Sequence, residues 1–218
     1  MSSCVQNIDV GFILDSSYSA RFDYQKEKDF IKTLVASFKV QDNGPVAGVV
    51  TFSDRAELSI KLNDFNNRDL SGFNKAVDDI PLMSKTTRTD KALRLAKNEL
   101  FTTANGAREG VPKVLIVVID GSQTRDPSAE DPYQIADELR ADGVKVLVVG
   151  ISEEVSRSEM VRLAGNNEEL VFKAATFDDL SASAFSASVL NTSCPGMLSH
   201  CTARAWLQMT FMRSNAYI

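Results

Sequence analysis

The sequence predicts an α/β fold, a doubly wound and mostly parallel six-stranded sheet with one antiparallel edge strand and helices on both faces. Short apolar runs alternate with longer segments of helical spacing, which implies parallel strands joined by right-handed crossovers. One run, 56–62, alternates apolar and polar residues, as is typical of an antiparallel edge strand. With 218 residues, of which 44% are hydrophobic, the chain has the length and composition of one soluble domain.

The first half of the chain predicts three strands and two helices. The apolar run 10–14 is a strand that ends in an acid and a serine cluster, and 46–52 and 56–62 are the next two strands. Segment 22–38 has helical spacing, which places four residues on one face: Phe30, Leu34, Val35 and Phe38. Segment 67–80 predicts the second helix, which Pro81 ends.

The second half predicts three more strands and four helices. Segment 89–101 is a helix by its apolar positions, which are Ala92, Leu93, Leu95, Ala96 and Leu100. Segment 114–119 is β-branched and uncharged, so we expect it to be the most buried strand; 144–151 and 170–176 follow as strands. Helices are expected at 131–141, with Gly143 as its cap, at 156–164 and at 178–190.

Acids and hydroxyls follow the expected strands where ligands bind such sheets. Asp15, Ser17 and Ser19 follow the first strand, Thr87 precedes the helix at 89–101, and Asp120 ends strand 114–119. The carboxyl ends of parallel strands meet at one edge of the sheet. Two close carboxylates repel unless a cation lies between them, and oxygen ligands favour Mg²⁺, Mn²⁺ or Ca²⁺ over zinc or copper. The sequence therefore predicts a divalent cation site at this edge.

This pattern resembles the metal-ion-dependent adhesion site of the von Willebrand factor type A family, with strands and helices in the same order over residues 5–194. The resemblance implies that the Ser17 and Ser19 hydroxyls bind the metal directly, and that Thr87 binds directly or through water. Asp15 and Asp120 would bind through bridging water. One coordination position would remain for a glutamate or aspartate of a protein ligand.

The residues before the threonine ligand depart from the family's usual pattern. The family usually has glycines before it, where this chain has Ser84, Lys85 and Thr86. We favour Thr87 because Thr89 is then placed to cap the following helix.

Simpler roles are open for each of these residues and their neighbours. Asp15, Ser17 and Ser19 could each cap a turn or helix, and Asp120-Gly121 could be a turn. Two residues inside the motif loops, Tyr18 and Arg88, are candidates for ligand contact. Four acids are expected to be solvated surface charges: Asp23, Glu27, Asp126 and Glu130.

The cysteines indicate an oxidising compartment. Cys4 precedes the first strand and Cys194 follows the last helix, so both should lie at the end of the sheet away from the metal, where they can pair; free thiols are the alternative. Cys201 would be left over, and Asn191 begins a glycosylation sequon. We expect a secreted matrix protein whose signal peptide is absent from this chain, divided into a lead-in (1–4), the A domain (5–194) and a tail without an assigned fold (195–218).

The resemblance is to the matrilin and collagen type VI members of the family, which implies a non-enzymatic adhesion module that binds collagen or another matrix protein. The same resemblance is compatible with tandem A domains or a homo-oligomer in the parent protein. The net charge of −5 disfavours nucleic acid as a partner, and no apolar run reaches the ~20 residues that span a bilayer. An intracellular scaffold is the alternative. An enzyme is disfavoured because the nucleophile elbow and the glycine-rich phosphate loop are missing, and because the only histidine, His200, is in the tail.

Overall fold

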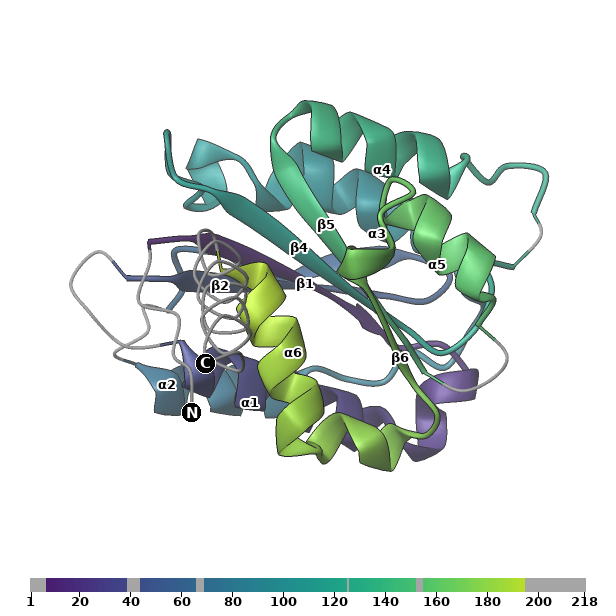
Figure 1. Ribbon diagram of the computed structural model, residues 1–218, viewed down its shortest axis with the longest axis horizontal. Helices are drawn as coiled ribbons and strands as arrows, with labels where there is room; N and C mark the ends of the chain where they lie inside the picture. The colour runs from purple at the N-terminus through teal and green to yellow at the C-terminus, as the bar shows by residue number, and fades with distance from the viewer. Residues whose placement is uncertain (1–6, 39–43, 66–68, 125, 152–154, 195–218) are drawn as a thin grey trace, which may run out of the picture.

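A computed structural model describes residues 7–38, 44–65, 69–124, 126–151 and 155–194 (Figure 1). At its centre is a six-stranded sheet with the order β3-β2-β1-β4-β5-β6. All neighbouring strands are parallel except β2 and β3. The strands are β1 (Asp9–Asp15), β2 (Val46–Phe52), β3 (Ala56–Ile60), β4 (Lys113–Ile119), β5 (Val144–Ile151) and β6 (Val171–Ala174). The predicted fold class is confirmed, including the antiparallel edge strand.

Helices cover both faces of this sheet, each over its own hydrophobic core. Figure 1 shows α1 (Tyr24–Ser37), α2 (Leu70–Asp79) and α6 (Ser183–Ser193) on one face. The other face carries α3 (Thr89–Leu95), α4 (Pro132–Ala141) and α5 (Arg157–Leu163). Strand β4 lies between β1 and β5 and is buried by both layers, as its uncharged sequence predicted.

Two helices differ most from their expected bounds, and the other four differ by one to three residues at an end. The helix expected at 89–101 ends as α3 at Leu95 and continues as a π-helical turn, η2 (Ala96–Leu100). The helix expected at 178–190 begins only at Ser183, because a 3-10 turn, η5 (Phe177–Ser181), comes first and is closed by a capping box between Thr176 and Asp179. The other short turns are η1 (Ser19–Phe22), η3 (Thr103–Asn105) and η4 (Glu168–Leu170).

The amino ends of the parallel strands and the end of α6 lie together, at the opposite end of the sheet from the loops after β1 and β4. Lys145, near the start of β5, donates a hydrogen bond to the Thr192 carbonyl at 3.2 Å. Cys194 follows at once, is buried and is disulfide-bonded. Cys4 and Cys201 lie outside the described residues, so pairing of Cys4 with Cys194 stays a prediction.

Two further predictions concern the chain ends. The lead-in (1–4) and the tail (195–218) lie outside the described residues. The sequon residue Asn191 is in the last turn of α6, where its side-chain oxygen Oδ1 is buried without a hydrogen-bond partner, and its glycosylation stays a prediction. Among the described residues, no helix has the length and apolar character needed to cross a membrane.

Candidate metal centre

The loop after β1 and the end of β4 bring four of the predicted ligands together. The backbone N–H of Ser17 donates to Asp15 Oδ1 at 2.8 Å, which holds the loop in a tight turn. The hydroxyls of Ser17 and Ser19 are 2.9 Å apart, and Ser19 donates to Asp120 Oδ1 at 2.8 Å. A continuous group of hydroxyl and carboxylate oxygens therefore joins two neighbouring strands at their carboxyl ends.

Thr87 is fastened to Thr124, in the loop that follows Asp120. Its N–H donates to the Thr124 hydroxyl at 3.0 Å, and its carbonyl accepts from the Thr124 N–H at 2.8 Å, so the loop before α3 is fastened to the loop after β4. Thr87 is buried, whereas Thr86 is exposed and its carbonyl accepts from Ser53 at 2.9 Å. Thr89 does not cap α3: the helix begins at Thr89, its N-cap is Arg88, and that side chain makes no cap hydrogen bond. That reason for choosing Thr87 was wrong, although the burial of Thr87 supports the same choice.

Ser16, in the loop after β1, fastens this loop to the one before α3. Its carbonyl accepts from the Ser84 N–H at 2.8 Å, and its hydroxyl accepts from the Met83 N–H at 2.7 Å. Ser84 has a φ of 55°, a left-handed conformation that is rare outside glycine. The loop therefore follows a turn that suits glycine, although this chain carries none there.

The buried carboxylates of this oxygen group favour the binding of a cation. Asp15 is fully buried, and its Oδ2 atom has no hydrogen-bond partner. Burial, together with the nearby negative charge of Asp120, raises the pKa of Asp15 to about 7. Within the described residues, no three His, Cys, Asp or Glu side chains are grouped closely enough to hold a metal, so a cation here must use hydroxyl ligands as well. An orphaned carboxylate beside two hydroxyls fits a hard divalent ion.

Comparison with known proteins decides the family. The family model described as "von Willebrand factor type A domain" matches residues 9–186. The chain belongs to the von Willebrand factor type A domain family. This A domain is 34% identical over 176 residues to the human collagen alpha-5(VI) chain, covering 80% of this chain and 6% of that protein. It is 30% identical to human matrilin-4, covering 78% of this chain and 27% of that protein.

A solved structure is similar as well. The proximal thread matrix protein 1 of the mussel byssus, in a form described as having a zinc-occupied MIDAS motif, matches with a TM-score of 0.80 and 26% identity. The match covers 89% of this chain and 50% of that one. This A domain thus spans a small part of the curated relatives it matches and half of this solved structure.

Arg88 is a structural residue of the A domain. It is 5% exposed and binds both carboxylate oxygens of Asp90, at 2.8 and 2.7 Å, and it also pairs with Asp126 at 3.0 Å. Burial alone would raise the pKa of Asp90, but the hydrogen bonds from Arg88 and from the Glu130 backbone lower it below its usual value. Arg88 was one of two candidates for ligand contact, and its buried guanidinium is bonded to Asp90 and Asp126 instead.

Tyr18, by contrast, remains available. Its side chain is 58% exposed, and the Arg21 guanidinium lies 3.7 Å from the centre of its ring. Arg21 also lies 4.1 Å from the ring of Phe22, which is 81% exposed. We call Tyr18, Arg21 and Phe22 the aromatic rim. They lie in and directly after the loop that follows β1, where they present two aromatic rings and one positive charge.

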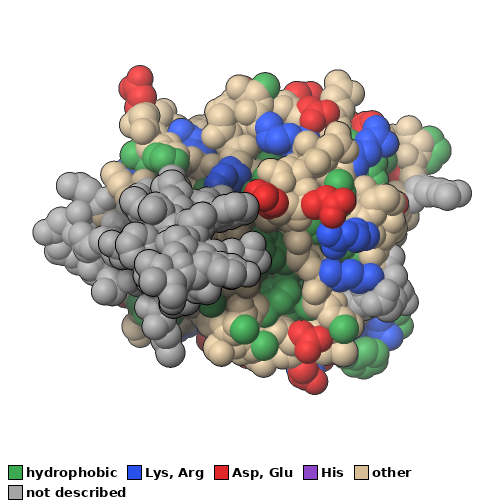
Figure 2. All heavy atoms as spheres, in the orientation of Figure 1, with side chains coloured by type: hydrophobic (Ala, Val, Ile, Leu, Met, Phe, Trp, Pro, Cys, Tyr) green, Lys and Arg blue, Asp and Glu red, His purple; other side chains and the backbone are tan. Residues whose placement is uncertain are grey.

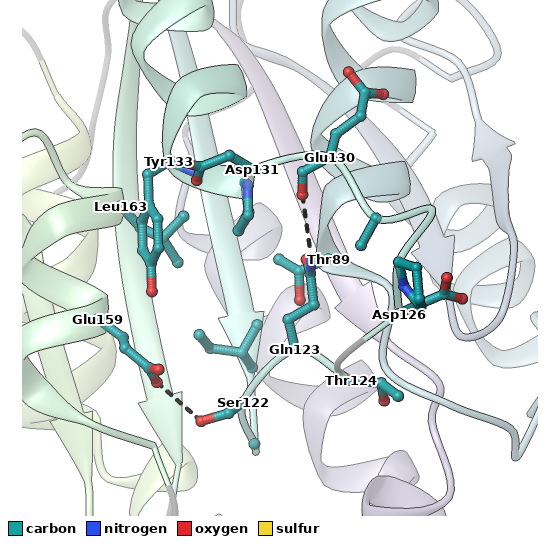
Figure 3. A pocket seen from close by; sticks show the side chains of 15 residues that line it. Thr89, Ser122, Gln123, Thr124, Asp126, Glu130, Asp131, Tyr133, Glu159 and Leu163 are labelled. Atoms are coloured by element: carbon teal, nitrogen blue, oxygen red, sulfur yellow. Dashed lines mark hydrogen bonds between the residues drawn. The ribbon is translucent and has the colours of Figure 1, made fainter.

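A cavity of about 620 Å³ adjoins the site, and its wall begins at Gly121 and Ser122, directly after Asp120. Figure 3 shows Tyr133, Leu163 and Glu159 on one side of it, facing Gln123 and Thr124. Ser122 donates to Glu159 at 2.9 Å across one end. The described lining residues include four acids and no basic residue; the acids are Asp126, Glu130, Asp131 and Glu159.

Glu27 was expected to be a solvated surface charge, and that prediction was wrong. It is 0% exposed, and both of its carboxylate oxygens lack a hydrogen-bond partner. The other three acids so predicted are not buried.

The surface of the domain carries charges of both signs. Acidic and basic side chains are interspersed over the face in Figure 2, without a broad basic patch among the described residues drawn there.

Proposed function

We propose that this A domain is a metal-dependent adhesion module that binds a carboxylate of a protein ligand at the loops after β1 and β4. The observation that carries the proposal is the oxygen group itself. The Ser17 and Ser19 hydroxyls lie 2.9 Å apart beside Asp120, and the buried Asp15 Oδ2 has no partner. A protein keeps such an acid buried when a cation completes the site.

Each residue has a distinct part in holding the cation. The hydroxyls of Ser17 and Ser19 would be its direct ligands, Thr87 would bind directly or through water, and Asp15 and Asp120 would accept hydrogen bonds from its bound waters. We propose Mg²⁺, with Mn²⁺ or Ca²⁺ as substitutes, because all of the ligands are oxygens. When bound, the ion supplies an electrophilic position for a ligand carboxylate, since its direct ligands are uncharged.

The relatives support an extracellular matrix setting. A collagen VI chain and matrilin-4 are matrix proteins, and the solved structure whose title names an occupied metal site is a byssus matrix protein. We propose a secreted, non-enzymatic domain whose ligand is collagen or another matrix protein. The aromatic rim and the cavity lined by Gly121 and Ser122 adjoin the metal-site loops, and we propose that they contact the residues beside the ligand carboxylate.

The metal site is tested by removing one oxygen at a time. We expect Asp15→Asn and Ser19→Ala to reduce Mn²⁺ and Mg²⁺ binding by at least about 10-fold in isothermal titration calorimetry, the usual cost of losing a metal-site partner. Binding to immobilised collagen should fall in parallel, and EDTA should abolish it in the wild type. Ser188→Ala is the matched control, because Ser188 is an exposed serine on α6 whose hydroxyl donates to the Ala184 carbonyl within the same helix.

Two outcomes would count against this function. A wild-type domain that takes up no divalent cation would refute the metal site. Collagen binding that persists in EDTA would mean that another surface binds collagen.

The alternative of an intracellular scaffold predicts free thiols, and the disulfide at Cys194 supports a secreted protein instead. Mass spectrometry of the protein purified without reductant would decide between them.

A further inference from the structure

Strand β2 also ends in a hydroxyl at the edge of the sheet that carries the metal centre. Ser53 directly follows Phe52, the last residue of β2, and it is fully buried. Strand β2 pairs in parallel with β1, and the register places Phe52 opposite Asp15. Ser53 is therefore a buried strand-end residue beside the first metal-site loop, although it lies outside the five motif positions.

The Ser53 hydroxyl makes two hydrogen bonds to the backbone of the loop before α3. It accepts from the Lys85 N–H at 2.9 Å and donates to the Thr86 carbonyl at 2.9 Å. A serine hydroxyl has one proton to donate and lone pairs to accept, so both bonds can form at once. The backbone continues this contact, because the Ser53 carbonyl accepts from the Arg88 N–H at 2.9 Å. Ser53 thus holds the loop on both sides of Thr87.

These bonds connect the loop to a rigid part of the domain. The Ser53 N–H donates to the Arg55 carbonyl at 2.8 Å, which fixes Ser53 itself in the turn between β2 and β3. The other anchor of Thr87 is Thr124, which lies in the loop after β4. Side chains supported by strands are held more precisely than those supported by loops. Ser53 is therefore the anchor that fixes Thr87 relative to the sheet.

We propose that Ser53 is a positioning residue of the metal centre, which holds Thr87 in one place and so makes the site selective for Mg²⁺ over Ca²⁺. It acts on the loop backbone and does not bind the cation. Mg²⁺ requires near-ideal octahedral geometry, whereas Ca²⁺ accepts longer and more variable distances. A fixed Thr87 thus favours the smaller ion. This inference rests on the proposed function.

The test compares the wild type with Ser53→Ala, Thr87→Ala, the double variant and Ser186→Ala. Ser186→Ala is the matched control, since Ser186 is a buried serine on α6 whose hydroxyl donates to the Leu180 carbonyl at 3.2 Å. Each protein is titrated with Mg²⁺ and with Ca²⁺ by calorimetry. Amide hydrogen exchange of residues 84–88 is measured in EDTA, which reports on the loop without the cation.

We expect Ser53→Ala to bind Mg²⁺ about 10-fold more weakly, as is usual on losing an outer partner of a metal ligand, and Ca²⁺ with a smaller loss. Exchange of the Lys85 amide in EDTA should become faster, because its acceptor is gone. In the Thr87→Ala background, Ser53→Ala should cost no further Mg²⁺ affinity, because its effect passes through Thr87. Ser186→Ala should match the wild type in both affinities.

Unchanged Mg²⁺ affinity in Ser53→Ala would overturn the inference, as would equal losses for the two ions or additive losses in the double variant. If Ser53→Ala does not fold, exchange in the wild type decides. The Lys85 and Arg88 amides should then be protected in EDTA, and exchange at the rate of a free peptide would overturn the inference. If the wild type binds no cation, the proposed function itself fails; if it binds Mg²⁺ and Ser53→Ala binds equally well, this inference alone fails.

Discussion

Arg88 connects two loops of the A domain through its side chain. It is nearly buried, holds both oxygens of Asp90 and reaches Asp126 in the loop after β4. Arg88→Gln would leave Asp90 buried without its partner. We expect a loss of about 3–5 kcal/mol in the free energy of unfolding, measured by urea denaturation.

Arg55→Gln is the control for this change. Arg55 also forms an ion pair, with Glu57 at 2.7 Å, but its side chain is 62% exposed. Its loss should cost about 1 kcal/mol or less, because water screens surface pairs. An equal loss in the free energy of unfolding for the two variants would show that the buried ion pairs of Arg88 stabilise the domain no more than a surface pair does.

Two residues show where prediction from the sequence reached its limit. The motif predicted Asp15, Ser17, Ser19 and Asp120 because their spacing relative to strand ends is a local property, and the structure joins them by hydrogen bonds. Glu27 was misread because a glutamate is almost always solvated, although its place one turn after Tyr24 is a local signal of the buried face. The structural role of Arg88 was not predicted because Asp126, its distant partner, lies beyond both α3 and β4 in the sequence.

At the scale of elements, the packing of η2 on the sheet depends on two glycines. Gly11 and Gly48 are partners in the β1–β2 ladder, and a Cβ atom on either would come within 2.6 Å of a Leu100 methyl group. The π-helical turn thus places Leu100 against bare backbone. Periodicity alone predicted one continuous helix here, because a π turn shifts the register without changing the apolar composition.

Gly48→Ala should therefore destabilise the domain by about 1–3 kcal/mol through overpacking. The added methyl group would meet Leu100 and also the Ile60 carbonyl at 2.9 Å, which is backbone and cannot turn aside. Thermal and urea unfolding measure the change. Gly121→Ala is the control, since a Cβ atom there meets nothing within 4 Å, and a similar loss in both would contradict the packing explanation.

At the scale of the whole molecule, the disulfide at Cys194 fixes the end of α6. Pairing with Cys4 would close a ring of about 190 residues, for which the chain-entropy model gives roughly 5 kcal/mol as an upper figure. We expect reduction to lower the thermal midpoint, and to change ligand affinity if the end of α6 sets the state of the metal site. Calorimetry and collagen binding with and without reductant test this, and Cys201→Ser should leave the midpoint unchanged.

The placement of the ligand loops and of Cys194 at opposite ends of the sheet also has a mechanical consequence. Tension between a captured partner and a tether at the end of α6 would run lengthwise along β1, β4 and β5. A force in that direction shears many ladder hydrogen bonds at once, whereas a sideways pull would open them one after another. If the proposed adhesion holds, a force applied in this way would be resisted by shear of the whole sheet.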